Sequence, residues 1–160
     1  MKISKIFLAM ALLLAVACHP DNGGDKGGDK TNWLDEGNIC GEWVLTSWSD
    51  KSESAMRVYL VLNEDSSFDL YQRLYSVIWL RFEGNYTLSG NTISGVYADG
   101  VAWSKSYTVS YAEEPTRIRL VSTTDVADKA IYTECDVPEY VLDQAQPATE
   151  VRSVAPERFL

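Results

Sequence analysis

Residues 79–88 read WLRFEGNYTL, and apolar and polar side chains alternate along this stretch. Alternation with a period of two predicts a β-strand with one buried face and one wet face. The same pattern returns in residues 101–111, VAWSKSYTVSY, and in residues 117–120, RIRL. Taken together, the alternating runs predict one buried face made of these side chains: Trp43, Leu45, Phe82, Tyr86, Ile93, Tyr97, Trp103, Tyr107, Ile118 and Leu120.

Short turn signals such as NEDSS, LSGN, ADG and EEP separate the apolar runs, as expected between antiparallel neighbours. The predicted strands cover residues 41–48, 56–63, 67–75, 79–88, 92–98, 102–111, 116–122 and 129–134. A helical period is limited to a turn or two near residues 139–144. The pattern therefore predicts an all-β domain, an eight-stranded antiparallel up-and-down barrel whose first strand pairs with its last.

Composition and charge limit the classes of partner. The chain carries a net charge of −9, which becomes about −11 if Lys2 and Lys5 leave with a leader peptide. Basic side chains must neutralise phosphates in nucleic-acid complexes, so we expect no nucleic-acid partner. Direct binding to anionic lipid is disfavoured for the same reason. Residues 38–144 have the length of one small domain.

The first 17 residues have the form of a bacterial signal peptide. Lys2 and Lys5 precede a short apolar run, and small residues occupy positions 15 and 17. The run is shorter than the roughly 20 residues of a membrane span. The sequence AVAC at residues 15–18 resembles the lipobox of bacterial lipoproteins, in which Cys18 would become the lipidated first residue. Cleavage after Ala17 by an ordinary export peptidase is the alternative.

Residues 18–38 contain a repeated Gly-Gly-Asp-Lys unit and few apolar side chains, a composition typical of a flexible tether. A lipid on Cys18 would attach this tether to the bacterial membrane. We therefore expect a lipoprotein of the cell envelope, on the periplasmic or the outer face of the outer membrane. His19, the one histidine, lies in the tether and is not expected to bind metal or act as a base.

Three cysteines, Cys18, Cys40 and Cys135, leave one thiol over in an exported protein. If Cys18 carries lipid, the other two can form a disulfide. Closure of the barrel would bring the start of the first strand near the end of the last, so we predict a Cys40–Cys135 bridge. The alternative is that these two thiols never meet.

Gly41-Glu42-Trp43 resembles the Gly-x-Trp signature that opens the first strand of lipocalins. The run FEGNYTLSGNTISGVYADGVAWSKSYTVS, starting at Phe82, is similar to bacterial lipocalin-like lipoproteins. Residues 129–135 lack the arginine that lipocalins place near the last strand. The resemblance covers roughly residues 39–140 and implies a function in binding or carrying a small ligand. We place the barrel domain at residues 39–145 and a tail at 146–160, which either lies against the barrel through Phe159 and Leu160 or is loose.

A ligand inside such a barrel would meet aromatic walls with a few phenol and indole donors, suiting a small hydrophobic or aromatic molecule. The candidate ligand-binding residues are Trp43, Phe82, Tyr86, Tyr97, Trp103 and Tyr107, each of which is also explained as core. The alternative function is a surface module with a filled barrel that contacts a protein or glycan through loop aromatics such as Trp48, Tyr75 and Trp79. In either case we expect a monomer.

Catalytic motifs are absent from the sequence. A nucleophile needs an adjacent base, and His19 lies outside the predicted domain. Glu113 and Glu114 precede Pro115 in a turn signal, which is typical of a solvated loop. The sequence contains no zinc-type cluster of Cys and His, no calcium-loop spacing and no phosphate-binding glycine motif. We therefore expect no enzyme, no metal and no cofactor.

Overall fold

The computed structural model describes residues 31–49, 56–150 and 156–160. The predicted signal peptide 1–17, the proposed lipid site Cys18 and most of the predicted tether lie outside these residues. In the part of the chain that is described, no helix is long and apolar enough to cross a membrane.

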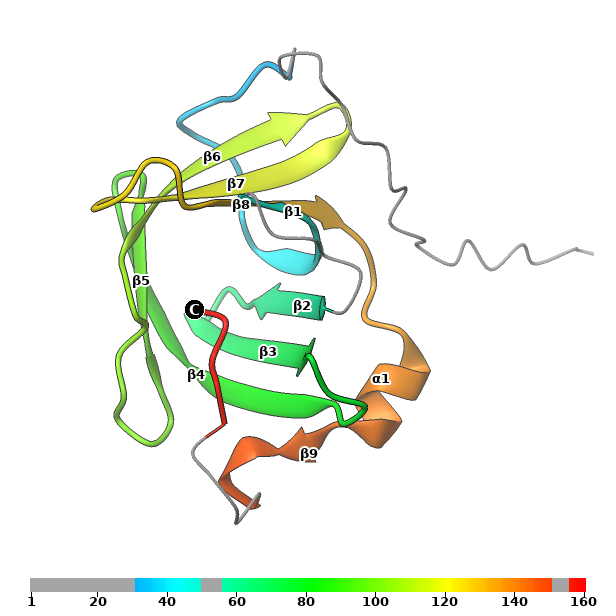
Figure 1. Cartoon of the computed structure of the whole chain (residues 1–160). Helices are drawn as coiled ribbons and strands as arrows, with labels where there is room; N and C mark the ends of the chain where they lie inside the picture. The colour runs from blue at the N-terminus through cyan, green and yellow to red at the C-terminus, as the bar shows by residue number, and fades with distance from the viewer. Residues whose placement is uncertain (1–30, 50–55, 151–155) are drawn as a thin grey trace, which may run out of the picture.

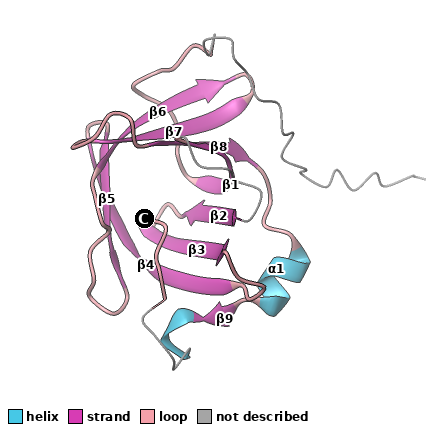
Figure 2. Ribbon diagram, in the orientation of Figure 1, coloured by secondary structure: helices cyan, strands magenta, loops and turns pink. Residues whose placement is uncertain are grey.

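Eight antiparallel strands form a closed up-and-down barrel, as predicted (Figures 1 and 2). They are β1 (Gly41–Trp48), β2 (Met56–Leu62), β3 (Ser67–Leu74), β4 (Leu80–Ser89), β5 (Thr92–Tyr97), β6 (Tyr107–Glu113), β7 (Thr116–Ser122) and β8 (Lys129–Glu134). Each strand pairs with its neighbours in sequence, and β1 pairs with β8 to close the ring. Closure leaves the barrel itself without an open edge.

The short elements after β8 lie against the outside of the barrel. The helix α1 (Glu139–Gln144) buries Val141 against a small outer cluster, made of Val44, Tyr59, Tyr71, Trp79, Cys135 and Val137. The two-residue strand β9 (Gln146–Pro147) pairs in parallel with the first residues of β4, and the 3-10 turn η2 (Ala148–Glu150) follows.

The side chains predicted for the buried face all belong to one central cluster inside the barrel. Aromatic rings fill much of it: Phe68 packs edge-on against Trp103, with ring centroids 5.2 Å apart, and against Tyr97 at 5.5 Å. Tyr97 also contacts Phe82 at 5.6 Å. The alternation rule fails at one end of β4, where Leu88 is 43% exposed although its partner Ile93 on β5 is buried.

The strand predicted at 102–111 begins later, at Tyr107. Trp103 instead crosses the face of β5 and donates its main-chain N–H to the carbonyl oxygen of Gly95 at 2.8 Å. The indole ring fills the place of a side chain at Gly95, where an added Cβ would lie 2.3 Å from Trp103 Cε2. The tryptophan therefore reaches the core from a loop and not from a strand.

The predicted Cys40–Cys135 disulfide is not formed, because Cys40 carries a free thiol. The main-chain N–H of Cys135 donates to the carbonyl oxygen of Glu42, so the pairing of β1 with β8 sets Glu42, and not Cys40, beside Cys135. Cys135 packs in the outer cluster. The thiol of Cys40 lies 3.6 Å from the Tyr86 hydroxyl, whose ring belongs to the inner cluster. The two cysteines thus face opposite sides of the barrel wall.

The end of the predicted tether, residues 31–38, contacts the barrel. Leu34 exchanges main-chain hydrogen bonds of 2.7 and 2.8 Å with Tyr111 on β6. The Arg119 guanidinium lies over the Trp33 ring, with its Cζ atom 4.5 Å from the ring centroid. Ordered contact with the domain therefore begins before residue 39.

Candidate functional site

One end of the barrel, which we call the mouth, is formed where β1 and β3 end and where β2, β6 and β8 begin. The chain of residues 156–160, the inserted segment, runs into this end and is not part of the barrel's strand pairing (Figure 1, red). Leu160 is 2% exposed and packs in the central cluster. The sequence left open whether the tail lies against the barrel or apart from it, and the segment is found inside.

The side-chain amide of Gln72 on β3 forms two hydrogen bonds with the main chain of the inserted segment, one through its nitrogen and one through its oxygen. Its Nε2 donates to the carbonyl oxygen of Glu157, and its Oε1 accepts the N–H of Phe159 at 2.9 Å. Gln72 is 2% exposed, and a buried amide needs such partners. Tyr97 on β5 adds a third main-chain contact, donating its hydroxyl hydrogen to the Leu160 carbonyl oxygen at 2.9 Å.

Arg158 fixes the segment through charge and aromatic contacts. Its guanidinium forms an ion pair with Asp99, with one Nη1 to Oδ1 distance of 3.2 Å. The same guanidinium lies over the rings of Tyr97, 4.4 Å from the centroid, and Phe82, at 5.6 Å. The hydrogen bond from Arg158 holds the pKa of Asp99 below its usual value.

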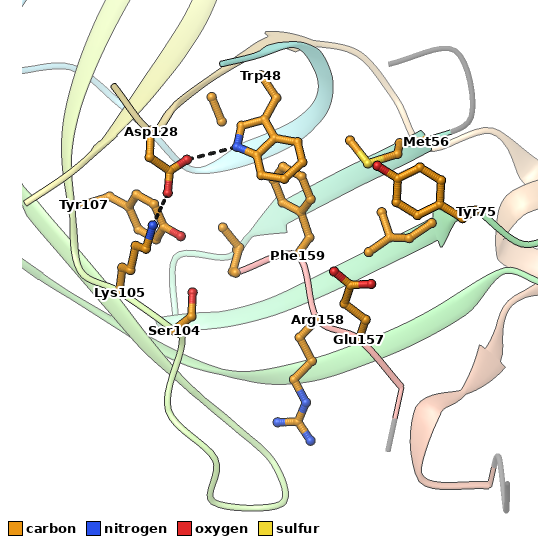
Figure 3. Close-up of a pocket in the computed structure, with 13 residues that line it drawn as sticks. Trp48, Met56, Tyr75, Ser104, Lys105, Tyr107, Asp128, Glu157, Arg158 and Phe159 are labelled. Carbon is orange, nitrogen blue, oxygen red and sulfur yellow. Dashed lines mark hydrogen bonds and ion pairs between the residues drawn. The ribbon is translucent and has the colours of Figure 1, made fainter. Parts of the chain in front are cut away.

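A cavity of about 180 Å³ remains at the mouth beside the segment (Figure 3). Phe159 packs edge-on against Trp48, with ring centroids 4.9 Å apart. Asp128 accepts hydrogen bonds from Trp48 Nε1, at 3.0 Å, and from the Lys105 ammonium. The bond to Asp128 raises the pKa of Lys105. The cavity thus has aromatic walls and one charged pair at its rim.

A second cavity, of about 420 Å³, lies on the other side of Arg158. It opens beside the first residues of β4, Leu80 and Arg81, which pair with β9 and not with β5. Its lining includes Phe82, Tyr97, Asp99 and Pro147. The two cavities share Arg158 of the inserted segment as a lining residue.

Five buried side-chain polar atoms among the described residues have no hydrogen-bond partner, and two of them lie inside the barrel: the hydroxyl of Tyr132 and the indole Nε1 of Trp103. Both side chains belong to the central cluster. Burial raises the pKa of Tyr132 well above that of a free phenol, and burial also raises the pKa of Tyr107. These phenols therefore stay protonated at neutral pH and retain a hydrogen to donate.

Two of the predicted ligand-binding residues lie at the end of the barrel opposite the mouth. Trp43 donates its indole N–H to the carbonyl oxygen of Ile39 at 2.9 Å. The Tyr86 hydroxyl donates to the carbonyl oxygen of Asn63 at 2.8 Å. Both donors are already satisfied, and these two rings close that end as part of the core.

The other four lie nearer the mouth. Phe82 and Tyr97 contact the inserted segment directly. Tyr107 lines the mouth cavity. Trp103 packs 6.4 Å from Tyr107, centroid to centroid, without lining that cavity. The predicted set is thus divided between the two ends of the barrel.

Sequence reasoning did not find Gln72, Asp99, Arg158 or the Lys105 and Asp128 pair as parts of a site. Gln72 offered a signal, since it follows Phe68 and Leu70 on the inward period of the strand at 67–75. A polar side chain on a buried face requires a partner. Asp99 and Arg158 carried no such signal, because their contact spans 59 positions of the chain.

The suggested aromatic platform is only partly exposed. Tyr75 is 64% exposed, whereas Trp48 is half-buried against Phe159 and Trp79 lies in the outer cluster. Within residues 31–49, 56–150 and 156–160, no group of three or more His, Cys, Asp or Glu side chains is arranged to hold a metal ion. The chain matches no model of a known protein family, and comparisons with curated proteins and with solved structures find no match.

Proposed function

We propose that this protein binds a small, mainly apolar ligand at the mouth of its barrel, as its resemblance to lipocalin-like proteins implies. The observation that carries the proposal is the inserted segment. A peptide that is not part of the barrel wall already occupies the mouth, with Leu160 seated in the central cluster.

The barrel does not need the segment for its strand pairing. Its ring is closed by main-chain pairing among β1 to β8, whereas the segment is held through the side chains of Gln72, Tyr97 and Asp99. Departure of the segment would leave that ladder of hydrogen bonds intact. It would also add the space of Phe159 and Leu160 to the present cavity of about 180 Å³. Ligand sites typically enclose roughly 300–1,000 Å³.

The walls define the chemistry of the ligand. Trp48, Leu74 and Tyr107 supply apolar area at the mouth, and Lys105 with Asp128 supplies a polar rim. Deeper in the barrel, the Tyr132 hydroxyl and the Trp103 indole are donors without a protein partner. A flat or branched apolar molecule with an acceptor group fits this distribution.

A neutral fluorescent naphthylamine tests the proposal. The probe should bind the full chain, and a Phe159→Ala/Leu160→Ala variant, whose segment is poorly seated, should bind it several-fold more tightly. Glu64→Ala, at an exposed residue of the turn between β2 and β3 at the opposite end of the barrel, is the control and should bind as the unmodified chain does. Equal, negligible binding by all three proteins would contradict the proposal.

We further propose that a lipid on Cys18 holds the protein in the bacterial envelope, at the outer membrane. Support comes from the pattern of residues 1–18 alone. The cysteine count no longer adds to it, because Cys40 is free and the expected bridge is not formed. Metabolic labelling with an alkyne fatty acid tests this: the full chain should be labelled, and the Cys18→Ser variant should not.

The surface-module function keeps one specific observation in its favour. The loop between β3 and β4 exposes Tyr75, Val77 and Ile78. Val77 is 89% exposed. Tyr140 and Leu142 of α1 are also exposed, and Tyr140 contacts Trp79, the last residue of this loop, with ring centroids 6.5 Å apart. If this patch carries the function, Val77→Asp should abolish partner capture while probe binding at the mouth is unchanged.

A further inference from the structure

We infer that the ligand of the barrel mouth is an extended peptide that presents a cationic, an aromatic and an aliphatic side chain in succession. This inference rests on the proposed use of the mouth as a binding site, and it goes beyond the small apolar ligand proposed above because it assigns a peptide to the same site. It is drawn from how the inserted segment is held, because that segment shows which chemical groups the barrel wall is built to receive.

The wall recognises a main chain. Gln72 offers one donor and one acceptor, and these meet the carbonyl of Glu157 and the N–H of Phe159. Tyr97 then meets the carbonyl of Leu160. A hydrocarbon ligand would leave the buried amide of Gln72 unpaired, which is costly. A peptide supplies the required acceptor, donor and acceptor at the spacing already present.

The wall also provides a separate subsite for each of three successive side chains. Asp99 receives the guanidinium of residue 158, with the rings of Phe82 and Tyr97 beneath it. Trp48 packs against the ring of residue 159. The central cluster encloses the side chain of residue 160. Subsites for a cationic, an aromatic and an aliphatic side chain, in this order, define a sequence preference for the bound peptide.

The residues that form each subsite are distant in sequence from the inserted segment. The hydrogen bonds to the segment span 63, 85 and 87 positions, and the ion pair spans 59. None of these contacts depends on the segment being covalently continuous with the wall. A separate peptide can therefore make the same contacts, and the chain's own segment competes only through its high effective concentration.

The test uses the fluorescein-labelled peptide Pro-Glu-Arg-Phe-Leu, the sequence of residues 156–160, and full-length protein. The Phe159→Ala/Leu160→Ala variant should bind this peptide at least about tenfold more tightly than the unmodified chain, because its own segment competes poorly. The matched control peptide carries an N-methyl group on its phenylalanine, which removes the donor to Gln72. It should bind the variant about five- to 100-fold more weakly.

A charge exchange gives a second, independent readout. In the same background, Asp99→Lys should weaken the arginine peptide and strengthen a peptide with glutamate in that place, each by roughly severalfold. If circular dichroism shows that the double variant is not folded, Arg158→Glu replaces it, because this change removes the ion pair and the ring contacts of residue 158 and keeps the side chains of Phe159 and Leu160. Equal binding of all these peptides, or none, by a folded variant would overturn the inference.

The naphthylamine probe separates this inference from the proposed function. A folded variant that binds the probe but no peptide contradicts the peptide inference and leaves small-ligand binding standing. A variant that binds neither contradicts both. Analytical ultracentrifugation of the unmodified chain, which measures its oligomeric state, tests whether the natural peptide comes from a second copy. Dimers that increase with concentration indicate segments exchanged between copies, and a monomer at all concentrations excludes a second copy as the source.

Discussion

Gln72 and Phe159, 87 positions apart, are joined by a 2.9 Å hydrogen bond in which the side-chain oxygen of Gln72 accepts the main-chain N–H of Phe159. The same side chain donates to the carbonyl oxygen of Glu157. A buried amide in the barrel wall is therefore satisfied by a segment that is not part of the wall. It follows that Gln72 needs an occupant at the mouth to complete its hydrogen bonding.

Replacing Gln72 with leucine should loosen the inserted segment, because the main chain at residues 157 and 159 loses both partners. Trypsin cleavage after Arg158 reports the released population, and its rate should rise by about five- to 100-fold, the equivalent of one unmade buried hydrogen bond. Gln144→Leu, the same change at an exposed helical site, should leave the rate unaltered. Equal cleavage rates in the two variants would show that Gln72 does not hold the segment.

Trp103→Ala should lower the free energy of unfolding by about 3–5 kcal/mol, the usual cost of removing a buried tryptophan. Trp103 is 5% exposed and packs on Phe68 and Gly95. Urea unfolding followed by circular dichroism measures the change. Val126→Ala, at a strongly exposed turn residue, should shift the midpoint little. A loss below about 1 kcal/mol at Trp103 would contradict its placement in the core.

Cys40→Ala should cost about 1 kcal/mol or less, because its thiol makes only a weak 3.6 Å contact with the Tyr86 hydroxyl. Loss of a native disulfide would cost about 2–5 kcal/mol. Alkylation in denaturant without reductant, followed by peptide mapping, should recover Cys40 in its alkylated form. Recovery of Cys40 cross-linked to Cys135 would show that the free thiol is wrongly assigned.

Stability should fall in alkali partly through Tyr59. Burial, together with the neighbouring Tyr140, raises the pKa of Tyr59 from 10.0 to about 12. The unfolded chain loses this proton at lower pH than the folded chain, so the contribution is complete below pH 10 and is lost as the pH rises to about 12. In Tyr59→Phe, the decline of the free energy of unfolding over this interval should be shallower. Identical slopes would count against a raised pKa at this tyrosine.

The barrel could be predicted because its cause is local. Alternation with a period of two is read directly along each strand, and turn signals between strands set the antiparallel order. The buried face followed from the same rule, and its members all lie in the central cluster. The predicted start of the strand at residue 102 was wrong, because Trp103 reaches the central cluster from a loop, where a glycine on β5 leaves room for its ring.

The site could not be predicted in the same way, because its contacts join distant parts of the chain. Nothing near Arg158 in the sequence indicates Asp99, and nothing near Phe159 indicates Trp48. Cysteine counting also misled, since pairing requires the two side chains to face each other, whereas the Cys40 thiol lies beside the Tyr86 hydroxyl and Cys135 packs in the outer cluster. Gln72 was the one residue whose pattern signalled an unmet partner.

The most direct measurement is amide hydrogen exchange at Phe159, followed by NMR in the full chain as the naphthylamine probe or the pentapeptide is added. Without ligand, this amide should be protected by its bond to Gln72. Saturating ligand should remove the protection, while amides within the ladder of β6 and β7 keep theirs. Saturation of the mouth with the Phe159 amide still protected would show that ligand and inserted segment do not share a site.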